Sequence, residues 1–296
     1  MNNKALSWTI LITLSLIWGS SFILMKQGLE AFSSDEVAGL RITIASVFML
    51  PFLIKYYKID LRKNLKGLLL MGVFGNLIPA FLFTKAETQI SSSLTGMLNA
   101  LTPLFTILIG MMVFKQPIGK NQMIGVSVGF LGAVALVVFG NNENDQTKNL
   151  LYCLLVAAAT ICYAISINSI KAYLGQLNSL QATVWSFTLI GPAGAIYLFG
   201  FTDVVSHAQQ NPNAGHALFY ICILAIVGSA ISVVMYNTLI KLSGTVFAAS
   251  CTYLIPIVAI VWGLLAGETV NLMQLLAVLI IITGIRLINF KGKIQE

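Results

Sequence analysis

The chain is a succession of long apolar stretches separated by short polar connections. The apolar residues run continuously through each stretch and do not alternate with a period of two, which favours helices over the strands of a membrane barrel. About 20 helical residues cross the hydrocarbon layer of a bilayer, and each stretch is close to that length. We predict ten transmembrane helices, at Trp8–Gln27, Glu36–Tyr56, Gly67–Ala86, Ser93–Phe114, Asn121–Gly140, Leu150–Ile170, Leu180–Phe199, Ala217–Ile240, Val246–Gly267 and Asn271–Asn289.

The composition agrees with this pattern. Of the 296 residues, 57% are hydrophobic and 9% are charged, and the mean hydropathy is +0.88. Soluble domains carry about 25% charged residues. Ten membrane helices account for roughly 200 residues, so the remaining residues form short loops and leave no room for a soluble domain.

The second half of the chain repeats the first. Leu101-Thr102-Pro103, followed by Gly110, matches Leu254-Ile255-Pro256, followed by Gly263, at an offset of 153 positions. A second register, offset by 145 positions, pairs Trp18 with Tyr163, Ser21 with Ser166 and Lys26 with Lys171. Because each half has an odd number of helices, the two halves must be inverted relative to each other in the membrane. Inverted repeats of this kind are typical of secondary transporters.

These observations predict an all-α integral membrane protein whose ten transmembrane helices form two inverted five-helix repeats around a central cavity. The first repeat is expected at residues 1–140 and the second at 150–296. Residues 141–149 are polar and are expected to be a periplasmic linker.

The basic residues indicate the orientation. With the N-terminus in the cytoplasm, 13 of the 17 basic residues fall on the inner face, and the others are Lys26, Arg41, Lys85 and Lys148. This asymmetry follows the positive-inside rule and places both termini in the cytoplasm. The net charge of +7 is therefore explained by membrane orientation. Nucleic acid is not an expected partner, because the basic residues are dispersed and form no patch with aromatic residues.

Polar and aromatic residues within the apolar helices are candidates for a substrate cavity, because polar side chains in a membrane usually face a cavity or another helix. The repeat-related Trp18 and Tyr163 are the best aromatic candidates. The complete expected substrate-binding set is Trp18, Ser21, Asn76, Asn99, Tyr163, Ser166, Tyr236 and Tyr253. Asn168 and Asn237 also lie within the apolar helices and are further candidates. For the serines and asparagines, helix packing and interhelical hydrogen bonds are the competing interpretation.

Three further residues are candidates for gating or hinge motion. Arg41 begins the second helix and can act as a gate or clamp a substrate carboxylate, although anchoring through Asp35 or Glu36 is the simpler interpretation. Pro103 and Pro256 occupy equivalent sites in the two repeats, where a kink can serve as a hinge or only shape the bundle.

Signatures of other chemistry are absent from the sequence. It contains no phosphate-binding loop for ATP, no zinc-protease motif and no nucleophile elbow. His207 and His216 are expected to be ordinary loop residues, the former in a connection at 202–215. Glu268 is the only acid expected near a helix core. We therefore expect no enzymatic activity, no cofactor and no bound metal.

Ten helices in two inverted repeats, the WGSSF motif from Trp18, Arg41 at the start of the second helix and Leu-x-Pro in a helix ending in Gly-Glu together resemble the drug/metabolite transporter superfamily, and its EamA-like members in particular. The resemblance covers residues 8 to 290. It implies a basket-like bundle that exports amino acids or similar metabolites across the bacterial inner membrane by alternating access. One departure is that Lys115-Gln116 stands in the first repeat where the second has Glu268.

The leading hypothesis is a metabolite exporter, and the expected substrate is an amino acid or a related metabolite. A drug or nucleotide-sugar transporter of the same superfamily is the alternative. A membrane-embedded lipid enzyme and a non-transporting receptor or scaffold are more remote. The expected partners are a small-molecule substrate and the lipid bilayer, and a homodimer is compatible with the sequence.

Overall fold

The computed structural model describes residues 3–115, 119–139 and 146–289, and all regular structure in these ranges is helical. The elements of the first half are α1 (Asn3–Gly28), α2 (Ser34–Tyr56), α3 (Leu61–Gly72), η1 (Val73–Leu77), α4 (Ile78–Glu87), α5 (Ser92–Leu98), η2 (Asn99–Leu101), α6 (Thr102–Met112) and α7 (Lys120–Phe139). Those of the second half are α8 (Gln146–Tyr173), α9 (Ser179–Phe201), α10 (Val204–Gln210), α11 (Ala214–Ala225), η3 (Ile226–Ile231), α12 (Ser232–Ala249), η4 (Ser250–Tyr253), α13 (Ile255–Leu265) and α14 (Leu272–Asn289).

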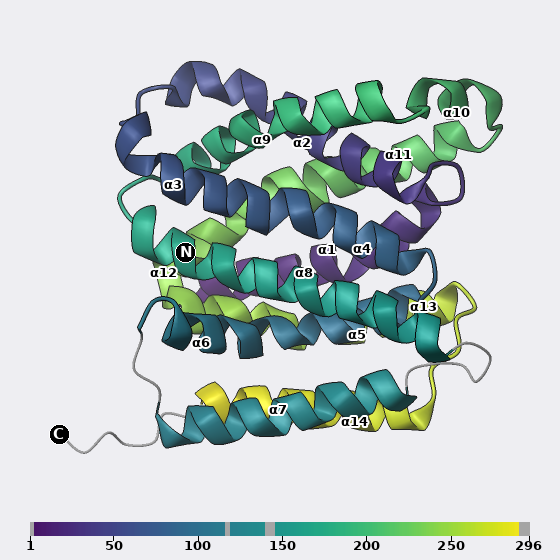
Figure 1. Cartoon of the computed structure of the whole chain (residues 1–296). Helices are drawn as coiled ribbons and strands as arrows, with labels where there is room; N and C mark the ends of the chain where they lie inside the picture. Colours follow the sequence, from purple (N-terminus) through teal and green to yellow (C-terminus); the bar gives the residue numbers. More distant parts are fainter. Residues whose placement is uncertain (1–2, 116–118, 140–145, 290–296) are drawn as a thin grey trace.

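These elements form a bundle of roughly parallel and antiparallel helices (Figure 1). Eight helical segments in the described ranges are long and apolar enough to cross a membrane, and Ile255–Leu265 and Leu272–Leu287 are shorter apolar helices. Several crossings combine successive elements, such as α3, η1 and α4. Gly244, at φ +80°, interrupts α12 and separates the eighth crossing from the ninth. The predicted all-helical, ten-crossing membrane fold is confirmed.

Each repeat contains the same two irregular segments. The π-helical segment η1 begins at Val73, and its counterpart η3 begins at Ile226, 153 positions later. The 3₁₀ segment η2 follows α5 in the first half, and η4 follows α12 in the second. Each is followed by a helix with proline in its first turn, at Pro103 and Pro256. Proline fits there because the first-turn N–H groups have no partner within the helix.

The change of offset between the repeats, from 145 to 153, has a structural cause. The connection between α2 and α3 is short, whereas the equivalent connection between α9 and α11 contains the additional helix α10. The prediction of an irregular loop at 202–215 is therefore wrong for residues 204–210. A polar helix of one or two turns lacks the periodic spacing of apolar residues that identifies the longer helices.

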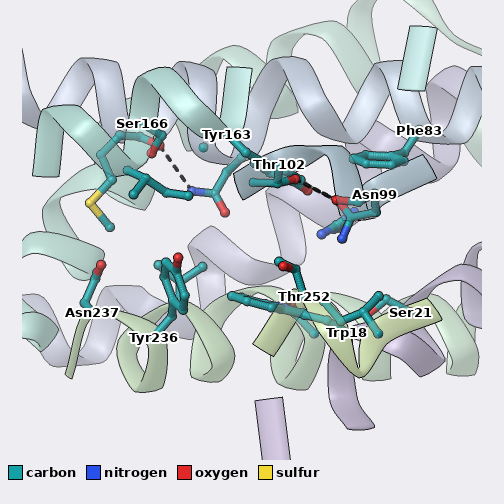
Figure 2. Close-up of a pocket in the computed structure, with 18 of the residues that line it drawn as sticks. Trp18, Ser21, Phe83, Asn99, Thr102, Tyr163, Ser166, Tyr236, Asn237 and Thr252 are labelled. Atoms are coloured by element: carbon teal, nitrogen blue, oxygen red, sulfur yellow. Dashed lines mark hydrogen bonds between the residues drawn. The ribbon is translucent and has the colours of Figure 1, made fainter. Parts of the chain in front are cut away.

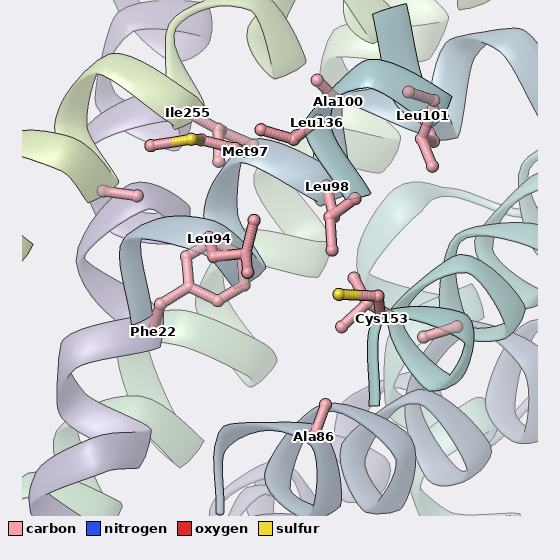
Figure 3. Close-up of a cluster of buried hydrophobic side chains, with 14 of the residues drawn as sticks. Phe22, Ala86, Leu94, Met97, Leu98, Ala100, Leu101, Leu136, Cys153 and Ile255 are labelled. Carbon is pink, nitrogen blue, oxygen red and sulfur yellow. The ribbon is translucent and has the colours of Figure 1, made fainter. Parts of the chain in front are cut away.

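Small residues bring helices into close contact. α7 packs along α14 at one edge of the bundle (Figure 1), where a Cβ on Gly284 would lie 2.4 Å from the backbone N of Gly129. Small residues allow such close backbone approach between membrane helices. The largest apolar cluster surrounds α5, where Met97 and Leu98 lie among residues of α1, α7, α8 and α13 (Figure 3).

Candidate functional site

A cavity lies at the centre of the bundle, where the two repeats meet. It has a volume of about 890 Å³, including space open to solvent. Its lining consists of Trp18, Ser21, Phe22, Met25, Arg41, Met71, Gly75, Asn76, Phe83, Asn99, Thr102, Tyr163, Ser166, Ile167, Ile170, Gly228, Val233, Tyr236, Asn237, Thr252 and Ile255. Both halves of the chain contribute to it.

Seven of the eight side chains expected to bind substrate line this cavity: Trp18, Ser21, Asn76, Asn99, Tyr163, Ser166 and Tyr236. The side chain of the eighth, Tyr253, lies outside the described residues. Arg41 also lines the cavity. Pro103 and Pro256 are not part of the lining, but each is the second residue of a helix whose first residue, Thr102 or Ile255, lines the cavity.

Two aromatic pairs face each other across the cavity. The ring centroids of Trp18 and Tyr236 are 5.1 Å apart, and those of Phe83 and Tyr163 are 5.7 Å apart with nearly parallel planes. Figure 2 shows the first pair along one wall and the second along the opposite wall. Trp18 and Tyr163 are 145 positions apart and Phe83 and Tyr236 are 153 apart, so the two pairs are equivalent under the repeat.

The indole N–H of Trp18 forms hydrogen bonds within the protein. Its Nε1 donates hydrogen bonds to the Gly228 carbonyl at 3.1 Å and to Ser232 Oγ at 3.0 Å. The Ser232 hydroxyl itself donates to the Gly228 carbonyl. These bonds connect α1 to the π-helical segment η3. Trp18 therefore presents the face of its ring, rather than its N–H group, to the cavity.

The asparagines divide into two roles. Asn99 and Asn76 line the cavity. Asn237 also lines it, where its Nδ2 donates to Thr183 Oγ1 at 3.1 Å and its buried Oδ1 has no hydrogen-bond partner among the described residues. Asn168 instead joins α8 to α6, because its Nδ2 donates to the Thr106 carbonyl at 2.9 Å. For Asn168 the interpretation as an interhelical hydrogen bond therefore holds, rather than that of a cavity residue.

Arg41 is turned toward the cavity and away from the acids near it in the sequence. Its Nε donates to Ser229 Oγ at 2.8 Å, and its Nη1 lies 3.8 Å from the sulfur of Met25. Glu36 is engaged elsewhere: it closes a capping box with Ser33 and contacts Nδ1 of His207 at 2.9 Å. The interpretation that Glu36 anchors Arg41 is therefore wrong.

His207 is also placed differently from the prediction. It belongs to α10, and its contact with Glu36 holds this helix against the first turn of α2. Within the described ranges, no three His, Cys, Asp or Glu side chains gather as a metal site would require.

The prediction that Glu268 is the only acid near a helix core is wrong. Glu87, the last residue of α4, is fully buried, and neither of its carboxylate oxygens has a hydrogen-bond partner in the described part of the chain. Lys26 Nζ donates to the backbone carbonyl of Glu87 at 2.9 Å. The sequence placed Glu87 at a helix end and gave no sign that α1 and α8 would cover it.

Glu268 caps the start of α5. Its two carboxylate oxygens accept hydrogen bonds from both the backbone N–H and the hydroxyl of Ser92 and of Ser93, at 2.5 to 2.9 Å. Burial acts to raise the pKa of this carboxyl group, but the bonds from Ser93 and Ser92 outweigh it and hold the pKa below its ordinary value. A carboxylate at a helix N-terminus is also favoured by the helix dipole.

Sequence reasoning missed several lining residues, including Phe83, Thr102 and Thr252. The repeat register contained the signal for two of them. Phe83 lies 153 positions before Tyr236, and Thr252 lies 153 positions after Asn99. Phe83 and Thr252 are thus the repeat equivalents of residues that were identified, whereas Thr102 is not.

Comparison with known proteins agrees with the geometry. The model of the EamA-like transporter family matches residues 6–138 and, a second time, residues 150–290. The chain belongs to the EamA-like transporter family. The two matches coincide with the two five-helix repeats, which confirms the resemblance and the inverted-repeat architecture. Members of this family are transporters.

The relatives described here have low sequence identity to this chain, and the alignments cover nearly its whole length. The uncharacterized inner membrane transporter YedA of Escherichia coli (strain K12) is 25% identical, with 94% of this chain and 89% of YedA covered. A protein of Salmonella typhimurium (strain LT2) named "Probable amino-acid metabolite efflux pump" is 23% identical, with 95% and 94% covered. One crystal structure aligns with a TM-score of 0.66 over 95% of both chains at 15% identity, which shows a shared fold alone.

Proposed function

We propose that this EamA-like membrane transporter carries an amino acid or a related small metabolite and works as an exporter. The observation that supports this most is the central cavity, which combines facing aromatic pairs with hydroxyl and amide groups. Such a mixture suits a small organic solute with both apolar and polar parts. The name of the Salmonella typhimurium relative, 23% identical, agrees with this substrate class.

Alternating access would use the irregular segments that both repeats share. Pro103 and Pro256 follow η2 and η4, where the hydrogen-bond ladder already changes from 3₁₀ to α. We propose these sites as hinges and Arg41 as the gating residue. Equivalent hinges would allow one repeat to rock against the other around the cavity.

We further propose a bacterial inner-membrane location with both termini in the cytoplasm, on the strength of the basic-residue asymmetry. The repeats would extend over residues 1–140 and 150–296, joined by a periplasmic linker at 141–149, of which 141–145 lie outside the described residues. A homodimer remains compatible with this arrangement.

Proteoliposomes containing the purified protein test the proposal directly. A thermal-stability screen with amino acids, nucleosides and sugars first identifies ligands, because a bound ligand stabilises the folded state. Labelled forms of the stabilising compounds are then tested for uptake. Flux of an amino acid or a related metabolite supports the proposal. Flux of nucleotide sugars alone would shift the substrate class, and intact protein without flux of any metabolite would contradict transport.

A further inference from the structure

The lining of the central cavity includes repeat-related residues from both halves, but its charge is not symmetric. Among the described residues that line it, Arg41 alone carries a formal charge. The repeat equivalent of Arg41, 145 positions later, is the neutral Ser186, which does not line the cavity. The cavity therefore has one cationic end.

The groups that contact Arg41 are neutral. Its guanidinium donates to Ser229 Oγ and approaches the sulfur of Met25. None of these groups carries a compensating negative charge. A guanidinium has five N–H donors in a planar fork, which suits a carboxylate better than it suits these partners.

The nearby acids do not compensate the positive charge. Glu36 is bound to Ser33 and His207, and Glu268 is bound to Ser92 and Ser93. Glu87 is fully buried, and neither of its carboxylate oxygens has a hydrogen-bond partner among the described residues. No carboxylate in the described part of the chain is therefore paired with Arg41, and its positive charge at this end of the cavity is uncompensated. An uncompensated charge is costly in a membrane-embedded site.

We propose that the cavity binds monoanionic carboxylates, with the carboxylate on Arg41 and an aromatic or apolar body between the Trp18–Tyr236 and Phe83–Tyr163 pairs. One excess cation balances one carboxylate, whereas a phosphate dianion would introduce a second, unbalanced charge. An ammonium group would find no acid in the described lining. This inference deepens the proposed function and depends on it for transport, but not for binding.

Binding to the full-length protein in nanodiscs tests the inference with solutes that share one ring and differ in charge. The probes are 3-phenylpropionate, phenylalanine, phenethylamine and phenyl phosphate. We expect 3-phenylpropionate to bind most tightly, and at least about tenfold more tightly than phenethylamine, because only the carboxylate forms a charge-assisted pair with Arg41. Equal or tighter binding of phenethylamine or phenyl phosphate would overturn the inference, as would no binding of any probe.

Substitutions of Arg41 test whether this residue binds the carboxylate of the ligand. Arg41→Gln removes the charge and should weaken 3-phenylpropionate at least about tenfold, with little effect on phenethylamine, while Arg41→Lys should retain part of the affinity. Arg62→Gln makes the same charge change at an exposed position of α3 and should leave binding unchanged. Unchanged affinity in Arg41→Gln would overturn the assignment. If that variant does not fold, the order of the four probes on the parental protein still decides.

The same probes separate this inference from the proposed function. Flux of phenethylamine without flux of 3-phenylpropionate in proteoliposomes would retain transport and contradict the carboxylate site. Binding of 3-phenylpropionate at Arg41 without flux of any metabolite would retain the site and contradict transport.

Discussion

Gly75 of η1 and Ser166 of α8 are in such close contact that a Cβ on Gly75 would lie 2.5 Å from Ser166 Oγ. The same relationship recurs in the other repeat, where a Cβ on Gly228 of η3 would lie 3.0 Å from Ser21 Oγ. All four residues line the cavity. Each serine therefore packs against the π-helical segment of the other repeat. These two contacts join the halves of the protein at the cavity.

The first prediction concerns this contact. Gly75→Ala should lower the free energy of unfolding by about 1 to 3 kcal/mol, the usual cost of overpacking, and should reduce transport. Replacing Ser166 with Gly in the same protein should restore much of the lost stability, because it removes the side chain that the new Cβ would meet. Gly200→Ala in α9 is the control, because a Cβ there meets nothing within 4 Å. Equal effects of the alanines at 75 and 200, measured by denaturation in detergent, would refute the explanation by close contact.

The second prediction concerns the aromatic walls. Trp18→Ala and Tyr163→Ala should each lower transport while the protein remains folded, because each removes one ring from a facing pair. Trp8→Ala is the matched control. Trp8 packs against Phe247 on an exposed surface outside the cavity, so its loss should leave transport unchanged. Parental rates for both cavity variants would show that the rings do not contact the solute.

The third prediction separates the two kinds of asparagine. Asn168→Ala should cost about 0.6 to 2 kcal/mol of stability through loss of the bond to the Thr106 carbonyl. It should leave ligand affinity nearly unchanged, because Asn168 does not line the cavity. Asn99→Ala should instead weaken ligand binding. Isothermal titration and thermal unfolding of both variants measure the two effects, and the reverse assignment of effects would contradict the structure.

The fourth prediction concerns pH. The lowered pKa of Glu268 means that its contribution to stability is fully present above the ordinary pKa of a glutamate and is lost as the pH falls through the lowered value. Glu268→Gln should cost about 1 kcal/mol near neutral pH, a typical cost of losing a helix cap, and this cost should shrink as the pH falls through the lowered pKa of Glu268. Thermal unfolding of both proteins across pH measures it. A constant difference at all pH values would exclude the ionised cap.

The sequence predicted much of the fold because membrane helices are defined by long apolar runs. It also predicted Trp18, Tyr163 and their serines as cavity residues, because the repeat register aligned them. It did not predict α10, which is short and polar, or the burial of Glu87, which depends on how α1 and α8 cover the end of α4. The hydrogen bonds of Trp18 were equally hidden, since they require the displaced carbonyl of a π-helical turn.

The most direct test of the account is whether solute passes through the cavity between the repeats. In a variant without native cysteines, Val233→Cys places a single thiol on the cavity wall, and a bulky thiol reagent is applied before flux is measured in proteoliposomes. The account predicts that the reagent abolishes metabolite flux and that a bound metabolite slows the modification. Unchanged flux through protein that is fully modified at this position would contradict it.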